Sequence, residues 1–517
     1  MRKSGILMPV ASLPGKYGIG TFGREAYKFV DFLALAGQQY WQLLPLGPTG
    51  YGDSPYQSFS TFAGNPYFID LEMLIEEGLL KKSECDACDF GKNPDEIDYE
   101  KIYLSRFKVL KKAFERSKHK NTKAYKDFIK KNEFWLNDYA LYMAVKSSFN
   151  GVSFIEWDEK ARVRDEKTLK EYEKKYAEDI DFYKFQQFYF DKQWKALKKY
   201  ANDLGVKIIG DIPIYVAFDS ADTWASPELF QFDSKGYPTA VAGCPPDGFS
   251  KTGQLWGNPL YDWKYHKKTG YEWWKKRIEH CYELYDMVRV DHFRAFDEYY
   301  SIPYGDPTAE FGKWKKGPGM GLMRAMKEVR GDKEMIAEDL GFMTDSVIKL
   351  VKDSGCPGMK VLQFAFDSRE DSDYLPHNYT RNSVVYTGTH DNDTTRGWFS
   401  KLSGDDKKMA CRYLNIPDED NDEVSWAFAR LALESVSNLC VIPIQDYLSI
   451  GEEGRINTPA TLGGNWVWRM KKGALNKTLA KKIYTLTKIS GRLYKAPKEE
   501  KHLSAADAQK ALVAHNK

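Results

Sequence analysis

The chain has 517 residues, of which 42% are hydrophobic and 29% are charged, and its formal net charge is only +3. A near-neutral chain has no global field that would attract nucleic acid or anionic lipid, so we expect a neutral substrate and no nucleic-acid partner. The longest apolar runs fall short of a membrane span, which predicts no membrane partner. Aromatic residues reach 15%, and flat rings of this kind suit the apolar faces of sugars.

The cysteines and the N-terminus indicate a cytoplasmic protein. The seven cysteines are an odd number, too sparse for a disulfide framework, and a reducing compartment suits them. Cys85 and Cys88 form a lone CxxC in a charged stretch with no second pair, so we expect no metal there. The basic first residues precede a short apolar run without a small-residue cleavage site, which indicates a first strand and not a signal peptide.

Eight short apolar or β-branched runs, each ending in polar or acidic residues, predict eight strands. They are residues 5–10, 40–46, 207–215, 287–292, 335–340, 361–366, 383–391 and 439–446. Segments of helical period lie between most of them, for example residues 23–36, 272–285 and 321–329. Eightfold alternation of strand and helix predicts an α/β fold, a (β/α)8 TIM barrel that forms one elaborated domain.

Two connections are longer than a simple crossover. Residues 71–203, between the second and third strands, are charged and of helical pattern, which predicts a mainly helical inserted subdomain. Residues 216–268, between the third and fourth strands, are rich in Gly, Pro, Trp and Asp, which predicts a long structured loop. We expect residues 1–70 and 204–498 to form the barrel with its active-site loops, no C-terminal β-sandwich, and a polar tail at 499–517.

Acidic residues end four of the predicted strands. They are Asp211, Asp291, Glu338 and Asp391, on the third, fourth, fifth and seventh strands. The C-terminal ends of parallel barrel strands meet at one face, so the four side chains are expected to lie close together. A single acid at a strand end is usually a helix cap. Four of them are costly together unless they have a function, so this group is the candidate active site.

The segments around these acids resemble the four signature regions of the α-amylase superfamily of glycoside hydrolases and transglycosidases. Within it, residues from about 5 to 469 are similar to the 4-α-glucanotransferases of glycoside hydrolase family 77, called amylomaltases or disproportionating enzymes. The similar loop motifs are YGDSPYQ at 51–57, CPPDGFS at 244–250, GQLWGNP at 253–259 and GNWVWR at 464–469. Such long motifs are more specific than any single acid.

The resemblance implies a role for each acid. Asp291 would be the nucleophile, Glu338 the general acid/base and Asp391 the stabiliser of the transition state. Arg289 would lower the pKa of Asp291 and aim its carboxylate. The implied substrate-binding residues are Arg289, Asp211, His390, Tyr56, Ser54, Gln254, Trp256, Asp367, Asn465 and Trp468.

The chemistry implied is a retaining displacement, in which two carboxyl groups stand about 5–5.5 Å apart. Glu338 must hold a proton that Asp291 has lost, so we expect burial and the neighbouring acids to raise the pKa of Glu338. No metal or other cofactor is required, and the sequence has neither a GxGxxG nor a GxxxxGK[ST] phosphate loop.

The implied function is transfer of 1,4-α-glucan segments to the 4-hydroxyl of an acceptor. The expected partners are α-1,4-glucans and maltooligosaccharides, with glucose as an acceptor, for a monomer or weak homodimer in the cytoplasm. A retaining α-glucan hydrolase would use the same acids and differ in what attacks the intermediate. A non-catalytic glucan-binding protein would keep the aromatic cleft but lose an acid. The motifs within residues 245–259 and the expected lack of a β-sandwich favour the transferase.

Overall fold

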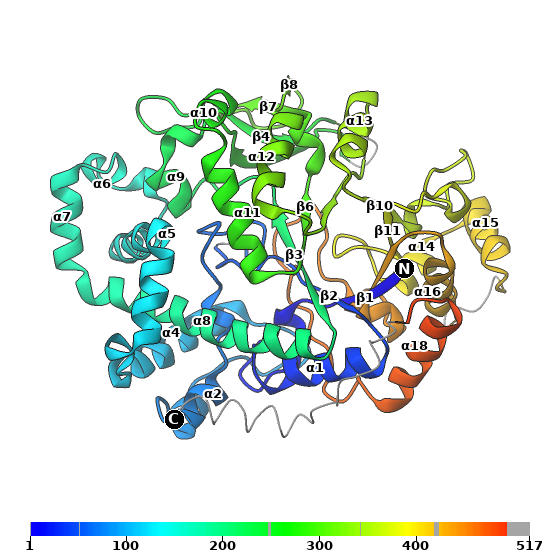
Figure 1. The fold of residues 1–517 in the computed structure, drawn as a ribbon, viewed down its shortest axis with the longest axis horizontal. Coiled ribbons are helices and arrows are strands. Elements are labelled where there is room, and N and C mark those ends of the chain that lie inside the picture. Colours follow the sequence, from blue (N-terminus) through cyan, green and yellow to red (C-terminus); the bar gives the residue numbers. More distant parts are fainter. Residues whose placement is uncertain (1, 51, 247–249, 342, 418–422, 494–517) are drawn as a thin grey trace.

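A closed barrel of eight parallel strands forms the centre of the molecule (Figure 1). The computed structural model describes residues 2–50, 52–246, 250–341, 343–417 and 423–493. The barrel strands are β1 (Lys3–Leu7), β2 (Tyr40–Gln42), β3 (Lys207–Pro213), β6 (Met287–Asp291), β9 (Met335–Ala337), β10 (Gly358–Val361), β11 (Ser383–Tyr386) and β12 (Leu439–Pro443). Each strand pairs with the next one in this order, and β12 pairs with β1. The predicted TIM barrel is confirmed.

The sixth strand of the barrel lies earlier in the chain than the apolar run predicts. The run covers residues 361–366, whereas β10 ends at Val361 and Leu362–Phe364 form a 3-10 turn. The strand begins at Gly358, where a Cβ atom would stand 2.2 Å from the carboxylate of Asp339. Glycine has a low strand propensity, so a search for apolar runs passes over a strand whose first residue must be glycine.

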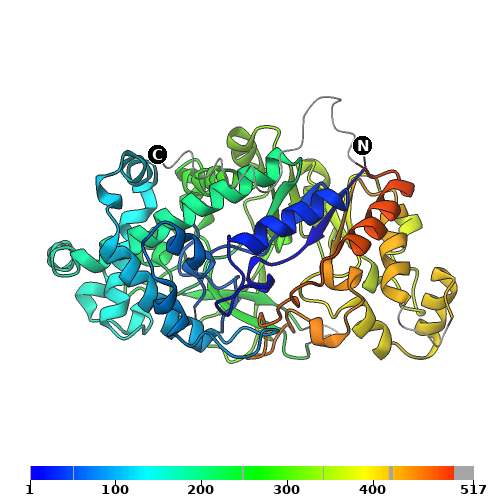
Figure 2. The same cartoon turned by 90° about the horizontal axis from the view of Figure 1, so that it is seen from below.

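Helices surround the barrel and pack on it through apolar stripes. Helix α1 (Arg24–Leu35) buries Ala26, Phe29, Val30 and Leu33, which recur at the spacing of one helix face. Figure 2 shows α1 between α8 (Ala177–Asp203) and α18 (Lys477–Ile489), both of which it contacts. The other helices from α9 onward are α9 (Ala221–Ala225), α10 (Trp263–Lys268), α11 (Glu272–Leu284), α12 (Met320–Arg330), α13 (Asp345–Ser354), α14 (Thr395–Lys401), α15 (Gly404–Leu414), α16 (Val424–Glu434) and α17 (Ile444–Tyr447).

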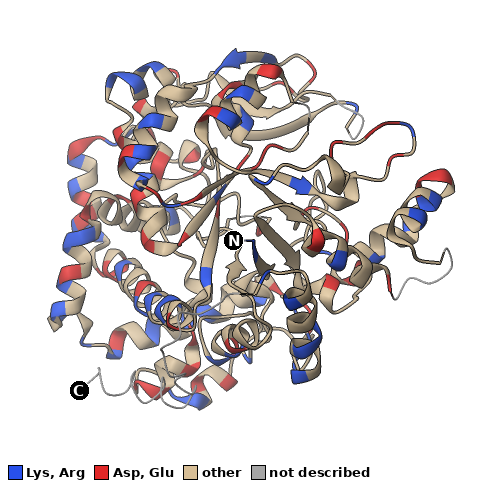
Figure 3. Ribbon diagram, turned by 45° about the vertical axis from the view of Figure 1, so that its right-hand side comes forward, with Lys and Arg blue, Asp and Glu red and all other residues tan. Residues whose placement is uncertain are grey.

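The long connection between β2 and β3 is helical, as its charge pattern indicates. It contains α2 (Leu71–Glu76), α3 (Lys82–Asp86), α4 (Tyr99–Arg116), α5 (Lys123–Ser148), α6 (Glu159–Arg162), α7 (Glu166–Lys175) and α8. Its helices carry both basic and acidic residues, interspersed along the ribbon (Figure 3). Its apolar side shares one buried cluster with the barrel, where the rings of Trp194 and Phe22 lie 5.0 Å apart. The division into a barrel and a separate subdomain 71–203 therefore stays a prediction.

The connection between β3 and β6 differs from the loop expected for residues 216–268. It contributes β4 (Ala240–Cys244) and β5 (Gln254–Pro259) to an antiparallel sheet completed by β7 (Glu298–Pro303) and β8 (Lys313–Lys316), in the order β5-β4-β7-β8. The Gly- and Pro-rich composition is typical of a loop. However, β4 pairs antiparallel with β7, which follows the fourth barrel strand, β6, in the chain. Local composition carries no information on such a distant pairing.

Some expectations fall outside the described residues. They are the polar tail 499–517, Tyr51 of the first loop motif and residues 247–249 of the second. None of the helices in the described part of the chain combines the length and the apolar character that a membrane span requires.

Arg492, which follows α18, ties the C-terminal helix to the seam where the barrel closes. Its guanidinium is fully buried and donates to the carbonyl oxygens of Lys3 at 2.8 Å, Leu433 at 2.6 Å and Ser435 at 3.0 Å. Lys3 starts β1 and pairs with Leu439 of β12. One side chain thus connects the first strand with the segment that leads into the last strand.

We expect Arg492→Met to lower the free energy of unfolding by about 2–4 kcal/mol, because the hydrogen bonds of a buried guanidinium to three carbonyl groups are lost. Urea denaturation followed by circular dichroism measures the change. Arg430→Met, which removes an exposed Arg430–Glu434 pair, is the control and should leave the midpoint unchanged. Equal midpoints for the two variants would contradict the role of Arg492 at the seam.

Candidate active site

One arginine lies between two carboxylates at the C-terminal end of the barrel. Asp211 on β3 is in register with Arg289 on β6, and Asp291 follows Arg289 on the same side of its strand. The Nη1 atom of Arg289 donates to both oxygens of Asp211 at 2.8 Å, and Nη2 lies 3.0 Å from Asp291 Oδ1. The positive charge stabilises two ionised carboxylates that would otherwise repel each other.

Glu338 is held beside Asp291 by the backbone. Val290 pairs with Ala337, so Asp291 and Glu338 leave adjacent strands side by side. The N–H of His292 donates to Glu338 Oε2 at 2.6 Å, and the N–H of Leu340 donates to Oε1 at 2.8 Å. His292 has a φ of 54°, a conformation uncommon for a residue other than glycine. This backbone turn carries the N–H of His292 to Glu338 directly after Asp291.

Burial raises the pKa of both carboxyl groups. The pKa of Glu338 rises to about 7, first because the group is buried and second because Asp291 is negative. The pKa of Asp291 rises to about 6 through burial, which outweighs the lowering by Arg289. Arg289 lowers the pKa of Asp291, as expected, but burial raises it by more. The expected rise in the pKa of Glu338 is found. Asp291 ionises before Glu338, so between about pH 6 and about pH 7 the pair holds one proton, mainly on Glu338.

Asp391 follows β11 and is held by a loop that comes after the last barrel strand. The amide Nδ2 of Asn457 donates to Asp391 Oδ1 at 2.7 Å, and Arg455 donates to the Asp391 carbonyl at 3.0 Å. His390 Nε2 lies 3.4 Å from the same carboxylate oxygen. Sequence reasoning missed Asn457 and Arg455. The sequence offered one indication of their role, namely that they follow the last barrel strand in a loop expected at the C-terminal face. No local spacing connects them with Asp391.

Aromatic rings form one wall of the site. Tyr56 donates its hydroxyl to Asp211 Oδ2 at 2.9 Å, and its ring stacks on His390 with centroids 5.1 Å apart. Trp466 belongs to the GNWVWR motif but was not among the predicted binding residues. The centroid of its ring lies 5.9 Å from the centroids of both the Tyr56 and the His390 rings. Ser54 accepts a hydrogen bond from the Tyr56 N–H at 3.3 Å. These contacts place Tyr56, His390 and Ser54 of the predicted set with Asp211.

Two further predicted residues, Trp256 and Gln254, lie next to His292, the residue that follows Asp291. Trp256 meets the His292 ring edge-on, with centroids 4.8 Å apart, and donates its indole N–H to Gln254 at 3.1 Å. Both side chains stand on β5 and are partly exposed. The antiparallel sheet thus brings Trp256 next to the residue that follows Asp291.

Three predicted residues have their described contacts elsewhere. Asp367 accepts from Arg369 Nε at 2.7 Å, and Asn465 accepts from the backbone N–H of Thr458 at 2.9 Å. The Trp468 ring is buried at 7% exposure, and its backbone forms a bridge with Glu96. In the described ranges no hydrogen bond or ion pair joins these three residues to Asp291, Glu338 or Asp391, so their roles in subsites stay predictions.

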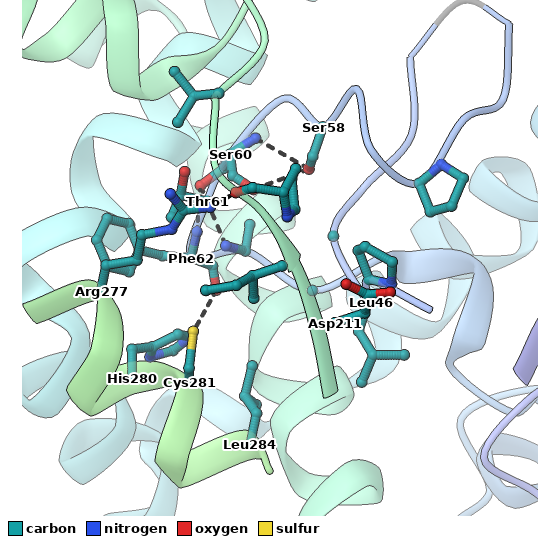
Figure 4. A pocket seen from close by; sticks show the side chains of 18 of the residues that line it. Leu46, Ser58, Ser60, Thr61, Phe62, Asp211, Arg277, His280, Cys281 and Leu284 are labelled. Atoms are coloured by element: carbon teal, nitrogen blue, oxygen red, sulfur yellow. Dashed lines mark hydrogen bonds between the residues drawn. The ribbon is translucent and has the colours of Figure 1, made fainter. Parts of the chain in front are cut away.

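One cavity is lined by Asp211 and Tyr56 and also by residues of α11. Figure 4 shows Asp211 on one side of it and Arg277 and His280 on another. Arg277 and His280 of α11 face it, but Arg277 donates to the carbonyl of Ile214 at 2.9 Å and His280 Nε2 lies 2.9 Å from the Phe62 carbonyl. These side chains hold the backbone that follows β2 and β3. Arg277 and His280 therefore stabilise the backbone segments that line the cavity next to Asp211.

Comparisons with known proteins agree with this geometry. The family model described as 4-α-glucanotransferase, of glycoside hydrolase family 77, matches residues 8–476. The chain belongs to this family. A curated 4-α-glucanotransferase from Clostridium butyricum is 50% identical over 487 residues, covering 94% of this chain and all of that protein. A curated 4-α-glucanotransferase from Thermus thermophilus is 46% identical over 501 residues, covering 95% of this chain and 99% of that protein. A solved amylomaltase from Streptococcus agalactiae, in complex with acarbose, has a TM-score of 0.92 at 42% identity, covering 96% of this chain and 100% of that chain.

Membership of the 4-α-glucanotransferase family makes this protein an enzyme that transfers glycosyl groups and acts on α-glucans. Asp291, Glu338 and Asp391 lie at the C-terminal face of the barrel, where enzymes of this fold carry their active sites. An amylomaltase from Corynebacterium glutamicum shares the fold with a TM-score of 0.75 at 19% identity.

We expect Arg289→Met to destabilise the protein more at pH 8 than at pH 5. Loss of the positive charge raises the pKa of folded Asp291 further above its unfolded value. A carboxyl group with a raised folded pKa costs stability as the pH rises from about 4 through the folded pKa. Urea denaturation should show a loss of about 3–5 kcal/mol at pH 8 and a smaller loss at pH 5.

Arg369→Met is the matched control, because Arg369 also pairs with an aspartate but is exposed. Its urea midpoint should not change at either pH. An equal loss at both pH values for Arg289→Met would mean that Arg289 does not stabilise the ionised form of Asp291.

Proposed function

We propose that this 4-α-glucanotransferase moves segments of 1,4-α-glucan to the 4-hydroxyl of glucose or another glucan by a retaining double displacement. The observation that carries the proposal is the connected group Asp211–Arg289–Asp291 with Glu338 fixed beside Asp291 by two backbone N–H groups. A nucleophile and an acid at neighbouring strand ends, with different pKa values, are the pair that this reaction needs.

In the first step, Asp291 attacks the anomeric carbon of the donor and forms a glucosyl ester. Glu338 gives its proton to the glycosidic oxygen as that bond breaks, and the released chain leaves with a free 4-hydroxyl. The raised pKa of Glu338 keeps this proton available near neutral pH. The side chain of Asp291 is 30% exposed, so a bound sugar can reach the carboxylate.

In the second step, Glu338 acts as the base. It takes the proton from the acceptor 4-hydroxyl, whose oxygen attacks the anomeric carbon and displaces Asp291. Two inversions at this carbon retain its configuration. Asp391, held by Asn457, stabilises the transition state through the sugar hydroxyls. Asp211, His390 and Tyr56 bind the same sugar ring.

A retaining hydrolase would differ only in the second step, where water attacks. Trp256 offers a partly exposed ring on which an acceptor sugar can stack, so that a bound hydroxyl competes with water. The roles of Ser54, Gln254, Asp367, Asn465 and Trp468 in outer subsites are part of this proposal. So are glucose as an acceptor, a monomeric or weakly dimeric state, and the cytoplasm, which suits seven free cysteines.

Incubation with maltotriose should give glucose together with maltopentaose and longer chains from the earliest times, measured by chromatography. Transfer to a sugar predicts this ladder, because every released maltosyl or longer unit is placed on another chain. Asp291→Asn should lower the rate about 10⁴-fold or more while the circular dichroism spectrum is unchanged. Maltose and glucose alone would identify a hydrolase, and an active Asp291→Asn variant would refute the nucleophile assignment.

The pH dependence of kcat/KM should be bell-shaped, with its maximum between the pKa values of about 6 and about 7. Below this range Asp291 becomes protonated and cannot attack, and above it Glu338 loses the proton that the leaving group needs. With α-maltosyl fluoride as donor, fluoride leaves without needing a proton from Glu338. The kcat/KM for fluoride release should therefore no longer fall as the pH rises above about 7. An unchanged basic decline would assign that limb to a group other than Glu338.

A further inference from the structure

A fully buried aspartate lies beneath the segment that carries His390 and Asp391. Asp446, in α17 directly after β12, is only 1% exposed. Its Oδ2 accepts from the hydroxyls of Thr387, at 2.5 Å, and Thr395, at 2.8 Å, and its Oδ1 accepts from the Thr395 N–H at 2.8 Å. Within the described ranges no Lys or Arg forms an ion pair with Asp446. These three donors satisfy its two side-chain oxygens.

The two threonines mark the ends of the segment that presents Asp391. Thr387 follows the last residue of β11, and Thr395 is the first residue of α14. Asp446 therefore joins both ends of residues 388–394 to the end of the neighbouring barrel strand. A tie at both ends restricts how far the segment can move towards or away from the barrel axis.

Hydrogen bonds and close packing within residues 388–394 hold the interior of the segment, so a displacement of its ends would also move Asp391. The N–H and the hydroxyl of Thr389 both donate to Asn392 Oδ1 at 2.9 Å, and the Asp391 N–H donates to the Thr389 hydroxyl at 3.2 Å. A Cβ atom on Gly388 would stand 2.7 Å from Gln363 Nε2. With its ends and its interior both bonded, the segment has little freedom to adjust its position.

A carboxylate at this place is costly, so its presence requires a reason. Burial penalises the ionised form and raises the pKa of Asp446, while the threonine donors oppose this effect. A neutral side chain could fill the space without that cost. Only a carboxylate offers two acceptor oxygens that hold two hydroxyls and one amide at once.

We propose that Asp446 is a positioning residue that sets the location of Asp391 relative to the reacting sugar. This inference rests on the proposed role of Asp391 in the transition state. Displacement of a reacting or stabilising group by 1 Å can cost about 100-fold in rate. Asp391 interacts more strongly with the transition state than with the bound donor, so its displacement lowers kcat more than it changes KM.

The test compares Asp446→Asn with Asp70→Asn. Asp70 is a matched control, because it is 8% exposed and also accepts from a backbone N–H, that of Met73 at 2.9 Å, and from the hydroxyl of Thr21 at 2.5 Å. Its partners lie at the start of α2 and in the loop before α1, and among the described residues no hydrogen bond or ion pair joins Asp70 to Asp291, Glu338 or Asp391. Maltotriose disproportionation is measured well below the melting temperatures of both variants.

We expect Asp446→Asn to lower kcat roughly 10- to 100-fold with a much smaller change in KM. Asp70→Asn should keep the kcat of the wild type even if its melting temperature falls as much. An unchanged kcat for Asp446→Asn, or an equal loss for Asp70→Asn, would overturn the proposal, because the first would show no effect on the site and the second only a general effect of a lost buried carboxylate.

A double-mutant comparison tests whether Asp446 acts through Asp391. Fluoride release from α-maltosyl fluoride is measured for the wild type, Asp391→Asn, Asp446→Asn and the double variant. If Asp446 positions Asp391, the second substitution should cost less than about twofold in the Asp391→Asn background. The same fold-loss in both backgrounds would overturn the proposal.

The two proposals fail in different ways. A wild-type rate for Asp391→Asn would refute the assigned role of Asp391 and with it the inference about Asp446. An impaired Asp391→Asn variant together with a fully active Asp446→Asn variant would leave the proposed function intact and overturn only the positioning role.

Discussion

The Arg289 guanidinium, between Asp211 and Asp291, is the interaction on which the site depends. Three charged groups meet there at the end of two adjacent strands, with Arg289 and Asp211 almost completely buried. Without the cation, two carboxylates would face each other in a poorly solvated space. Because Arg289 is on the same strand as Asp291 and in register with Asp211, the barrel itself sets the spacing of the three charges. Neighbouring strands can then add Glu338 at a defined place.

Fixed backbone and buried polar groups position the remaining acids. Two N–H groups hold Glu338, and Asn457 holds Asp391 from a loop beyond the last strand. Each arrangement leaves a carboxyl group oriented before any sugar binds, so little reorganisation is needed during the reaction. Burial raises the pKa values of both Asp291 and Glu338, while Arg289 lowers that of Asp291 and the charge of Asp291 raises that of Glu338 further. The two values therefore differ, which suits the two groups to the different roles proposed for them.

The sequence predicted the barrel, the helical connection between its second and third strands, and the four acids at strand ends. The predictions succeeded where the signal is local, as with the apolar run before Asp291 or the spaced apolar residues of α1. They failed where partners are distant. The pairing of β4 with β7, the strand that begins at Gly358 and the hold of Asn457 on Asp391 have no local pattern.

The sequence by itself therefore determined the chemical groups of this protein and their places at the ends of apolar strands. Strand periodicity put Arg289 and Asp291 on one side of β6, and family motifs connected these residues with glucan transfer. Only the tertiary structure decided how far burial raises each pKa and which loop residues hold Asp391. It also decided that Trp468 is buried and that Trp256 meets His292. These outcomes depend on atoms brought together from distant segments, and desolvation and hydrogen bonding act through that surrounding space and not along the chain.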